Sequence, residues 1–152
     1  MVQIRQELEI AASPEKIFAA IVDLTGYDRW LPSSPAFAGI TEISPGPVGL
    51  GTTWTEVGPS GTRHGTVTRW QPPTGVTFHQ PMTMKSRRLG VIDITVAIDL
   101  TPGPDSVTVR RVVTVSPGWP LVLVRPLVLR PFRTESGRTL RMLKSFVERP
   151  TG

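Results

Sequence analysis

The sequence predicts an α+β fold in which a curved antiparallel sheet of about seven strands wraps around one long C-terminal helix. Three observations predict this fold. Short segments of alternating apolar and polar residues occupy the chain from residue 40 to residue 116, a pattern typical of half-buried strands. Turns rich in proline and glycine separate these segments, and their short lengths favour antiparallel pairing. One amphipathic stretch then ends near Glu148.

The size and composition predict a single domain that covers residues 1–152. A chain of 152 residues with 39% apolar and 19% charged residues can bury a full core, as ordinary globular domains do. Cysteine is absent, which excludes disulfides and thiolate metal sites and favours a reducing compartment. No signal-peptide pattern is readable at the N-terminus. We therefore expect a cytoplasmic protein, with peripheral attachment to a membrane as an option.

The first thirty residues predict a strand followed by two short helices. Residues 2–10 alternate between apolar and polar side chains, as a strand with one buried face does. Ser13 and Pro14 favour the start of a helix, because serine caps the first turn and proline suits its first position. Gly26 ends this helix, and residues 27–31 predict a second, short helical turn.

The middle of the chain predicts a meander of six further strands, which together with the first give about seven. The cleanest alternation runs from Ile92 to Leu100, and Pro81 indicates a bulge or an edge position because proline cannot donate to the ladder. The predicted strands cover residues 40–44, 52–57, 63–71, 76–84, 92–100 and 107–115.

The C-terminal helix is predicted between Trp119 and Glu148. Pro126 and Pro131 interrupt its first half, and a proline inside a helix removes a hydrogen bond and kinks the backbone. Two alternatives follow from these prolines. Either the regular helix starts near Phe132, or a broken first half forms a flap over the mouth of a cavity.

Several segments resemble the START-like (SRPBCC) superfamily, in particular its bacterial polyketide cyclase/dehydrase and lipid-transport branch. The resemblance covers almost the whole chain and implies a helix-grip fold with a cavity between the sheet and the C-terminal helix. It implies a lipid, polyketide or aromatic ligand and no universal catalytic residue, although some members catalyse cyclisations or dehydrations. The segments that carry it are Ile10–Phe18, Asp23–Pro32, Val48–Thr52, Val67–Pro73 and Leu140–Glu148.

No common catalytic or cofactor motif is present. The chain has no Gly-x-Ser-x-Gly elbow, no phosphate-binding loop and no dinucleotide fingerprint. His64 and His79 are its only histidines, and without spaced carboxylates they are weak evidence for a metal site. We therefore expect no metal ion and no cofactor.

Arg111 is the clearest candidate for a polar group inside the cavity. It shares its strand face with Val109 and Val113, and a buried charge needs a partner or a ligand. Glu56 shares a face with Trp54 and could meet Arg111 across the sheet. One interpretation is that Arg111 holds the carboxylate or enolate of a mostly apolar ligand. The other is a structural ion pair, or a bulge that turns Arg111 to solvent.

His64 shares strand parity with Thr66, Thr68 and Trp70, so it is predicted to line the cavity as well. In an enzyme it would act as the general base, because its pKa lies near neutrality. The other candidate contacts are apolar or aromatic residues that core packing alone would also explain. They are Tyr27, Trp30, Trp54, Phe78, Met82 and Met142.

The leading functional hypothesis is the binding or transport of a small hydrophobic molecule in the cavity. The first alternative is a cyclase or dehydratase in which His64 is the base and Arg111 stabilises an oxyanion. The second is a module that rests on an anionic membrane surface through the basic, apolar segment 119–133. From Arg110 onwards the net charge is +7, which a solvated helix face would also explain.

Other partners are less favoured. The aromatic residues do not interleave with the basic cluster, which argues against nucleic acid. The apolar run from Leu121 to Leu129 would equally suit a dimer contact, so the sequence leaves monomer and homodimer open.

Overall fold

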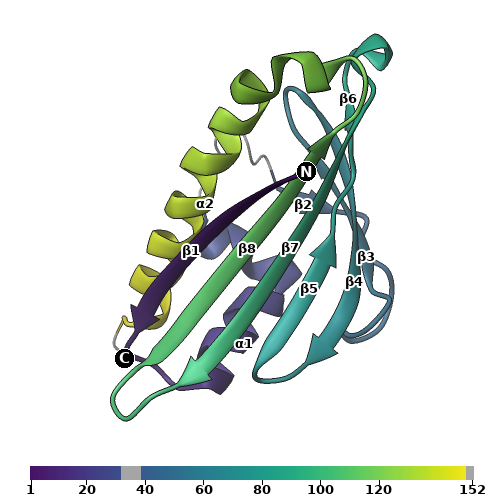
Figure 1. The fold of residues 1–152 in the computed structure, drawn as a ribbon. Coiled ribbons are helices and arrows are strands. Elements are labelled where there is room, and N and C mark those ends of the chain that lie inside the picture. The colour runs from purple at the N-terminus through teal and green to yellow at the C-terminus, as the bar shows by residue number, and fades with distance from the viewer. Residues whose placement is uncertain (32–38, 150–152) are drawn as a thin grey trace.

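A computed structural model of the chain describes residues 1–31 and 39–149, and it has the predicted architecture (Figure 1). Among these residues, eight strands form one sheet, and one long helix follows the last strand. In chain order the elements are β1 (Val2–Ile10), α1 (Pro14–Val22), η1 (Leu24–Arg29), β2 (Ile40–Thr41), β3 (Thr53–Val57), β4 (Gly61–Gln71), β5 (Gly75–His79), β6 (Met82–Met84), η2 (Arg87–Leu89), β7 (Val91–Pro102), β8 (Val107–Pro117), η3 (Leu121–Val124) and α2 (Arg125–Val147).

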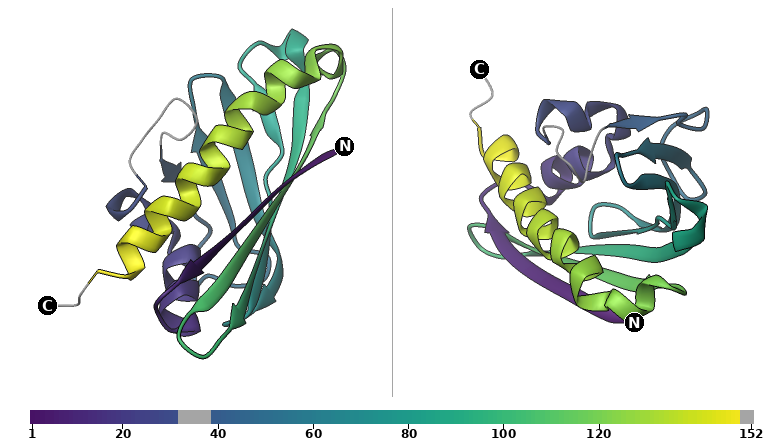
Figure 2. Two further views of the ribbon diagram at one scale, coloured as in Figure 1. Left: turned by 60° about the vertical axis from the view of Figure 1, so that its left-hand side comes forward. Right: turned by 90° about the horizontal axis from the view of Figure 1, so that it is seen from above.

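The sheet is antiparallel throughout and follows the order β1-β8-β7-β5-β4-β3-β2, with β6 paired to β4 and β7. It curls around α2, which crosses its concave side, while α1 and η1 lie at the far end of that side (Figure 2). Helix α2 contacts β1, β8 and α1. The predicted α+β helix-grip fold is therefore confirmed.

Helix α1 begins as the sequence predicts. The Ser13 hydroxyl oxygen accepts a hydrogen bond from the Lys16 backbone N–H at 3.2 Å, and Pro14 occupies the first helical turn. Its apolar side chains Ile17, Phe18 and Ile21 are buried against the sheet. The second helical turn is the 3-10 helix η1, which begins at Leu24 and not at residue 27.

The strands differ from the predicted ones mainly at their ends. The hairpin of β7 and β8 is longer than predicted, and β2 contains only Ile40 and Thr41. The predicted strand 76–84 is two strands, β5 and β6, with Pro81 between them. Pro81 has no N–H for a ladder hydrogen bond, so the predicted irregularity at this position is confirmed as a break.

Helix α2 is continuous from Arg125 to Val147, so the regular helix does not start near Phe132. The other alternative is wrong as well in its broken first half, because the helix is not interrupted at Pro126 or Pro131. Pro126 lies in the first turn, where a backbone N–H has no helical partner in any case. Pro131 lies inside the helix, and the Leu127 carbonyl therefore lacks the hydrogen bond that a residue with an N–H would give it.

Candidate ligand-binding cavity

The register of β8 fixes the direction of Arg111. Arg111 pairs with Gln6 of β1 and with Ile98 of β7, and neither ladder shifts along its length. Val109 and Val113, two residues to either side, are buried in the core. Side chains alternate along a strand, so Arg111 points to the interior. The alternative in which a bulge turns it to solvent is wrong.

The guanidinium of Arg111 is held by helix α2 and still offers donors to the interior. Its Nη1 donates a hydrogen bond to Ser136 Oγ at 2.6 Å, and a guanidinium has five N–H donors in total. No fully enclosed side-chain nitrogen or oxygen of the described residues lacks a hydrogen-bond partner. The Arg111 donors that do not bond to Ser136 are therefore not enclosed by protein atoms, and they open onto cavity space. Burial, with a smaller effect of the nearby Arg63, lowers the pKa of Arg111 to about 10, and the group stays charged at neutral pH.

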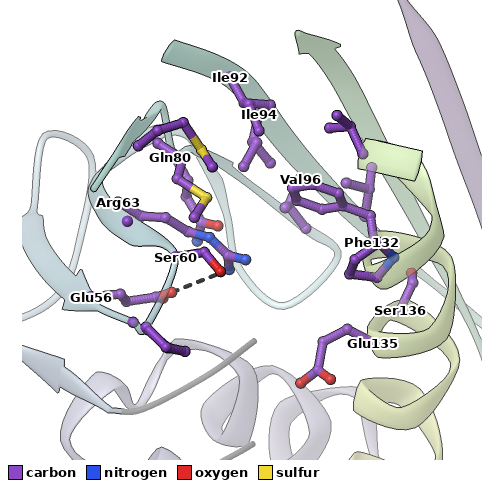
Figure 3. Close-up of a pocket in the computed structure, with 18 of the residues that line it drawn as sticks. Glu56, Ser60, Arg63, Gln80, Ile92, Ile94, Val96, Phe132, Glu135 and Ser136 are labelled. Carbon is purple, nitrogen blue, oxygen red and sulfur yellow. Dashed lines mark hydrogen bonds and ion pairs between the residues drawn. The ribbon is translucent and has the colours of Figure 1, made fainter. Parts of the chain in front are cut away.

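A cavity of about 290 Å³ lies between the sheet and the first half of α2. Its walls are mostly apolar: Figure 3 shows Ile92, Ile94 and Val96 of β7 on one side and Phe132 of α2 on another. Its rim includes the turn 57–61 between β3 and β4 and the side chain of Leu127. A smaller compartment of about 70 Å³ continues towards η1.

The two compartments meet at a ring of polar side chains, which we name the polar belt. They share six lining residues, and Val96 is the only apolar one among them. The two acidic members face the cavity from opposite sides, one on β3 and one on α2 (Figure 3). The polar belt consists of Glu56, Arg63, Gln80, Arg111 and Glu135.

Glu56 is positioned by an aromatic residue of its own strand. Trp54 packs against Gly65 of β4, where an added Cβ would come within 2.1 Å of the indole ring. The indole Nε1 donates to Glu56 Oε1 at 3.3 Å. Arg63 Nη1 lies 3.4 Å from Glu56 Oε2. Burial raises the pKa of Glu56, and the charge of Arg63 and the hydrogen bond from Trp54 offset this only in part.

The prediction that Glu56 and Arg111 pair directly with each other is wrong, because each has a different partner. Glu56 pairs with Arg63, which is its neighbour on β4 in the β3–β4 ladder, and Arg111 donates to Ser136. Arg63 was not predicted at the site. It also lies over the ring of Phe132, 5.7 Å from the ring centroid, and so connects the sheet to α2.

Of six further candidates, four line a compartment and two do not. Tyr27, Trp30 and Phe78 surround the small compartment, and Met82 lines the large one. The Tyr27 hydroxyl donates to the Ile21 carbonyl, and burial raises its pKa. Trp54 and Met142 line neither compartment. Trp54 stands behind Glu56, and Met142 is half-buried against the core.

His64 lies on the outer face of the sheet and is exposed, so the prediction that it lines the cavity is wrong. The register of β4 with β5 shifts between Val67 and Arg69. This bulge places His64 and Trp70 on opposite faces although both have even numbers. Arg63 occupies the inward position next to His64.

Sequence reasoning missed four polar residues that face the interior: Arg63, Gln80, Glu135 and Ser136. A signal existed for two of them. Ser136 lies between Leu129 and Leu140 on the apolar stripe of α2 and is 1% exposed. Glu135 is a single acid in an arginine-rich segment, and its carboxylate lies 2.7 Å from Arg138.

Within residues 1–31 and 39–149, no group of three or more histidine, aspartate or glutamate side chains is placed to hold a metal ion. In the same part of the chain, no helix has the length and apolar character that crossing a membrane requires.

The sequence of residues 1–148 matches the family model described as "Polyketide cyclase / dehydrase and lipid transport". No curated protein sequence matches the chain.

Several solved structures share the fold. The Aha1 dimer from Colwellia psychrerythraea is 22% identical, with all of both chains covered and a TM-score of 0.67. Truncated norcoclaurine synthase from Thalictrum flavum is 19% identical, with 99% of this chain and 95% of that chain covered and a TM-score of 0.73. The di-domain ARO/CYC StfQ from the steffimycin biosynthetic pathway is 14% identical, with 97% and 50% covered and a TM-score of 0.74. At these identities the likeness concerns the fold.

Proposed function

Because the chain belongs to the polyketide cyclase/dehydrase and lipid transport family, we propose that it binds a small, largely apolar ligand that carries one acidic group. The apolar part occupies the large compartment, and the acidic group lies at the polar belt. The observation that carries this proposal is the Arg111 guanidinium, which is enclosed, charged and only partly occupied by Ser136.

The shape of the cavity supports a ligand of this kind. Ligand pockets are mostly apolar, with a few polar groups that fix the orientation of the ligand, and have volumes of roughly 300–1,000 Å³. The large compartment, at about 290 Å³, lies at the lower end of that range. A compact aromatic or short polyketide acid therefore fits better than a two-chain lipid.

The charges of the polar belt favour an acid at Arg111. Glu56 already has Arg63 as its partner, and Glu135 has Arg138. Arg111 has a neutral partner in Ser136. A ligand carboxylate or enolate next to Arg111 would therefore form a charge-assisted hydrogen bond, which is about twice as strong as a neutral one.

Two fluorescent probes that differ in one acidic group test the proposal. They are 8-anilinonaphthalene-1-sulfonate and N-phenyl-1-naphthylamine, which has the same ring system without the sulfonate. Arg111→Met should weaken binding of the sulfonate by about tenfold to a hundredfold, because a hydrogen bond to a charged group is lost. Binding of the neutral probe should persist. Arg110→Met, on the exposed outer face of the same strand, is the matched control and should change neither affinity.

A second pair of variants tests whether the probes enter the cavity. Val96→Phe adds a ring where the two compartments meet and should abolish binding of both probes. Thr95→Phe adds the same ring on the outer face of β7 and should leave binding intact. Unchanged binding in Val96→Phe would contradict the proposal, provided that its thermal unfolding midpoint stays close to that of the parent protein.

A second candidate function is an enzyme of the cyclase or dehydratase type, with Glu56 as the base in place of His64. The position of the Glu56 carboxyl in the polar belt, with its raised pKa, favours this role, because a base works best with a pKa near the operating pH. Glu56 would take a proton from a carbon between two carbonyls, and Arg111 would stabilise the enolate oxygen. The enolate carbon would then attack the carbon of a second carbonyl, and Glu56 would give its proton to the alkoxide that forms.

The enzyme hypothesis is tested with a synthetic poly-β-ketone acid and chromatographic analysis of its cyclised products. Glu56→Gln should abolish any turnover above the uncatalysed rate and leave binding of the sulfonate probe within about threefold. His64→Ala should leave turnover unchanged, since His64 is on the outer face. Absence of turnover in the parent protein would leave binding alone as the function.

A further inference from the structure

Two segments that are far apart in the sequence form one basic and apolar surface at the end of the molecule where α2 begins. They are residues 85–91, which contain η2, and residues 119–133, which contain η3 and the first turns of α2. We name them together the basic tip. The backbone N–H of Gly118 donates to the Val91 carbonyl at 3.0 Å, and an added Cβ on Gly90 would lie 2.8 Å from the Trp119 carbonyl oxygen. Figure 1 shows η2, the short teal helix, beside the segment that leads from β8 into α2.

The basic tip exposes large apolar side chains to an unusual degree. Trp119 is 74% exposed, Leu123 is 68% exposed and Leu127 is 71% exposed. Val91, Val122 and Val124 are also exposed. Scattered apolar side chains on a surface need no explanation, but a contiguous group marks an interaction site.

The charge of the basic tip has one sign. It contains six cations and no acidic residue. The six cations are all exposed, and together they exceed the net charge of +5 of the whole chain, so the remaining residues sum to −1. The cations are Lys85, Arg87, Arg88, Arg125, Arg130 and Arg133.

We propose that the basic tip docks on an anionic lipid bilayer. Apolar side chains flanked by arginine and lysine are the combination that inserts into the boundary between headgroups and acyl chains. Each cation near an anionic leaflet strengthens the attraction. The basic tip also adjoins the cavity, because Leu121, Leu127 and Val128 line it. Docking would therefore bring the bilayer next to the cavity mouth.

Two other occupants fit the basic tip less well. A symmetric dimer would place the same surface on both partners, so that six cations would face six cations without an acid between them. A nucleic acid would satisfy the cations, but stacking on bases requires several aromatic side chains. Trp119 is the one exposed aromatic residue of the basic tip, and its exposed aliphatic residues would have no role there.

Co-sedimentation with vesicles tests the proposal. The protein should bind vesicles that contain phosphatidylglycerol in phosphatidylcholine, and high salt should weaken this binding. Pure phosphatidylcholine vesicles should bind it far less. Arg87→Gln combined with Arg88→Gln should lower the partition coefficient by about 30-fold, because two cations are lost. Arg5→Gln combined with Arg110→Gln removes the same charge from the outer sheet face and should have little effect.

The apolar contribution needs variants of its own. Trp119→Ser and Leu123→Ser should each weaken binding to the anionic vesicles by about tenfold or more. Both side chains are exposed, so the thermal unfolding midpoint of each variant should stay close to that of the parent protein. The proposal is overturned by an absence of binding, by equal binding to neutral vesicles, or by equal loss in the outer-face control. A stable dimer that Leu123→Ser dissociates would also overturn it.

This proposal and the proposed ligand function fail separately. The variants of the basic tip should still bind N-phenyl-1-naphthylamine, and Val96→Phe should still bind the anionic vesicles. An absence of vesicle binding by the parent protein would therefore overturn membrane docking and leave the evidence for a ligand in the cavity unchanged.

Discussion

The two halves of helix α2 are held in different ways, although they form one continuous helix. In the C-terminal half Leu140, Leu143 and Val147 are buried, and they follow one another at helical spacing. In the N-terminal half Leu129 is the only fully buried residue between Arg125 and Glu135, and Leu127 is 71% exposed. The first half therefore covers the cavity and the second half fastens the helix to the rest of the molecule.

Hydrogen bonds follow the same division. At the C-terminal end the Ala11 N–H donates to Glu148 Oε2 at 2.7 Å, and Lys144 Nζ donates to the Glu9 carbonyl at 2.9 Å. At the other end Pro131 removes a hydrogen bond from the helix itself. The difference indicates that stability is concentrated at one end of the helix. Local opening has a low cost where few apolar contacts are buried, so the half that lines the cavity is the half we expect to open more easily.

The largest expected effect separates the two halves directly. Leu143→Ala should lower the free energy of unfolding by about 2–5 kcal/mol, because it removes a buried side chain and leaves a cavity. Leu127→Ala makes the same chemical change at an exposed position and should alter the free energy by less than about 0.5 kcal/mol. Urea denaturation of both variants measures the difference. Equal losses would contradict the division of α2 into a fastening half and a covering half.

A second comparison, between strands with and without a register shift, explains which side-chain directions could be predicted from the sequence. Alternation correctly predicted that Arg111 points inward, because the ladder between β7 and β8 has no register shift. On β4 the same reasoning failed for His64. The bulge between Val67 and Arg69 depends on the pairing with β5, and a single sequence does not reveal such a shift.

The polar belt illustrates a second limit. Arg111 could be found because it interrupts a run of valines on one strand face. Arg63 lies on β4 ahead of the bulge between Val67 and Arg69, and Gln80 directly precedes Pro81, so alternation along these segments is interrupted. Their meeting with Glu135 of α2 depends on how the helix crosses the sheet, which is a property of the packed molecule. The proline rule likewise placed the helix start too late. Pro126 lies in the first turn, which tolerates proline, and the helix continues through Pro131.

A smaller effect is expected from restoring the helical hydrogen bond in the covering half. Pro131→Ala provides an N–H for the Leu127 carbonyl and should raise the free energy of unfolding by about 1–3 kcal/mol. Pro126→Ala is the matched control. It lies in the first turn, where the N–H has no helical partner, and should change the free energy by less than about 0.5 kcal/mol. A loss of stability in Pro131→Ala would show that its ring packing at the cavity outweighs the missing hydrogen bond.

The smallest effect concerns the fastening end and depends on pH. The hydrogen bonds from Ala11 and Lys144 hold the pKa of Glu148 below its usual range. A carboxyl whose pKa is lower in the folded state contributes stability above its unfolded pKa and loses that contribution as the pH falls through the folded value. Glu148→Gln should therefore be less stable than the parent protein at pH 7. The two should converge as the pH falls below about 4.

The measurement is the midpoint of urea unfolding at a series of pH values. Glu7→Gln is the control, because it removes one carboxylate from an exposed position of β1 and leaves the end of α2 untouched. If the difference between Glu148→Gln and the parent protein did not change with pH, the charge of Glu148 would have no part in fastening the helix. The buried stripe of Leu140, Leu143 and Val147 would then be sufficient to hold α2 against the sheet while its first half covers the cavity.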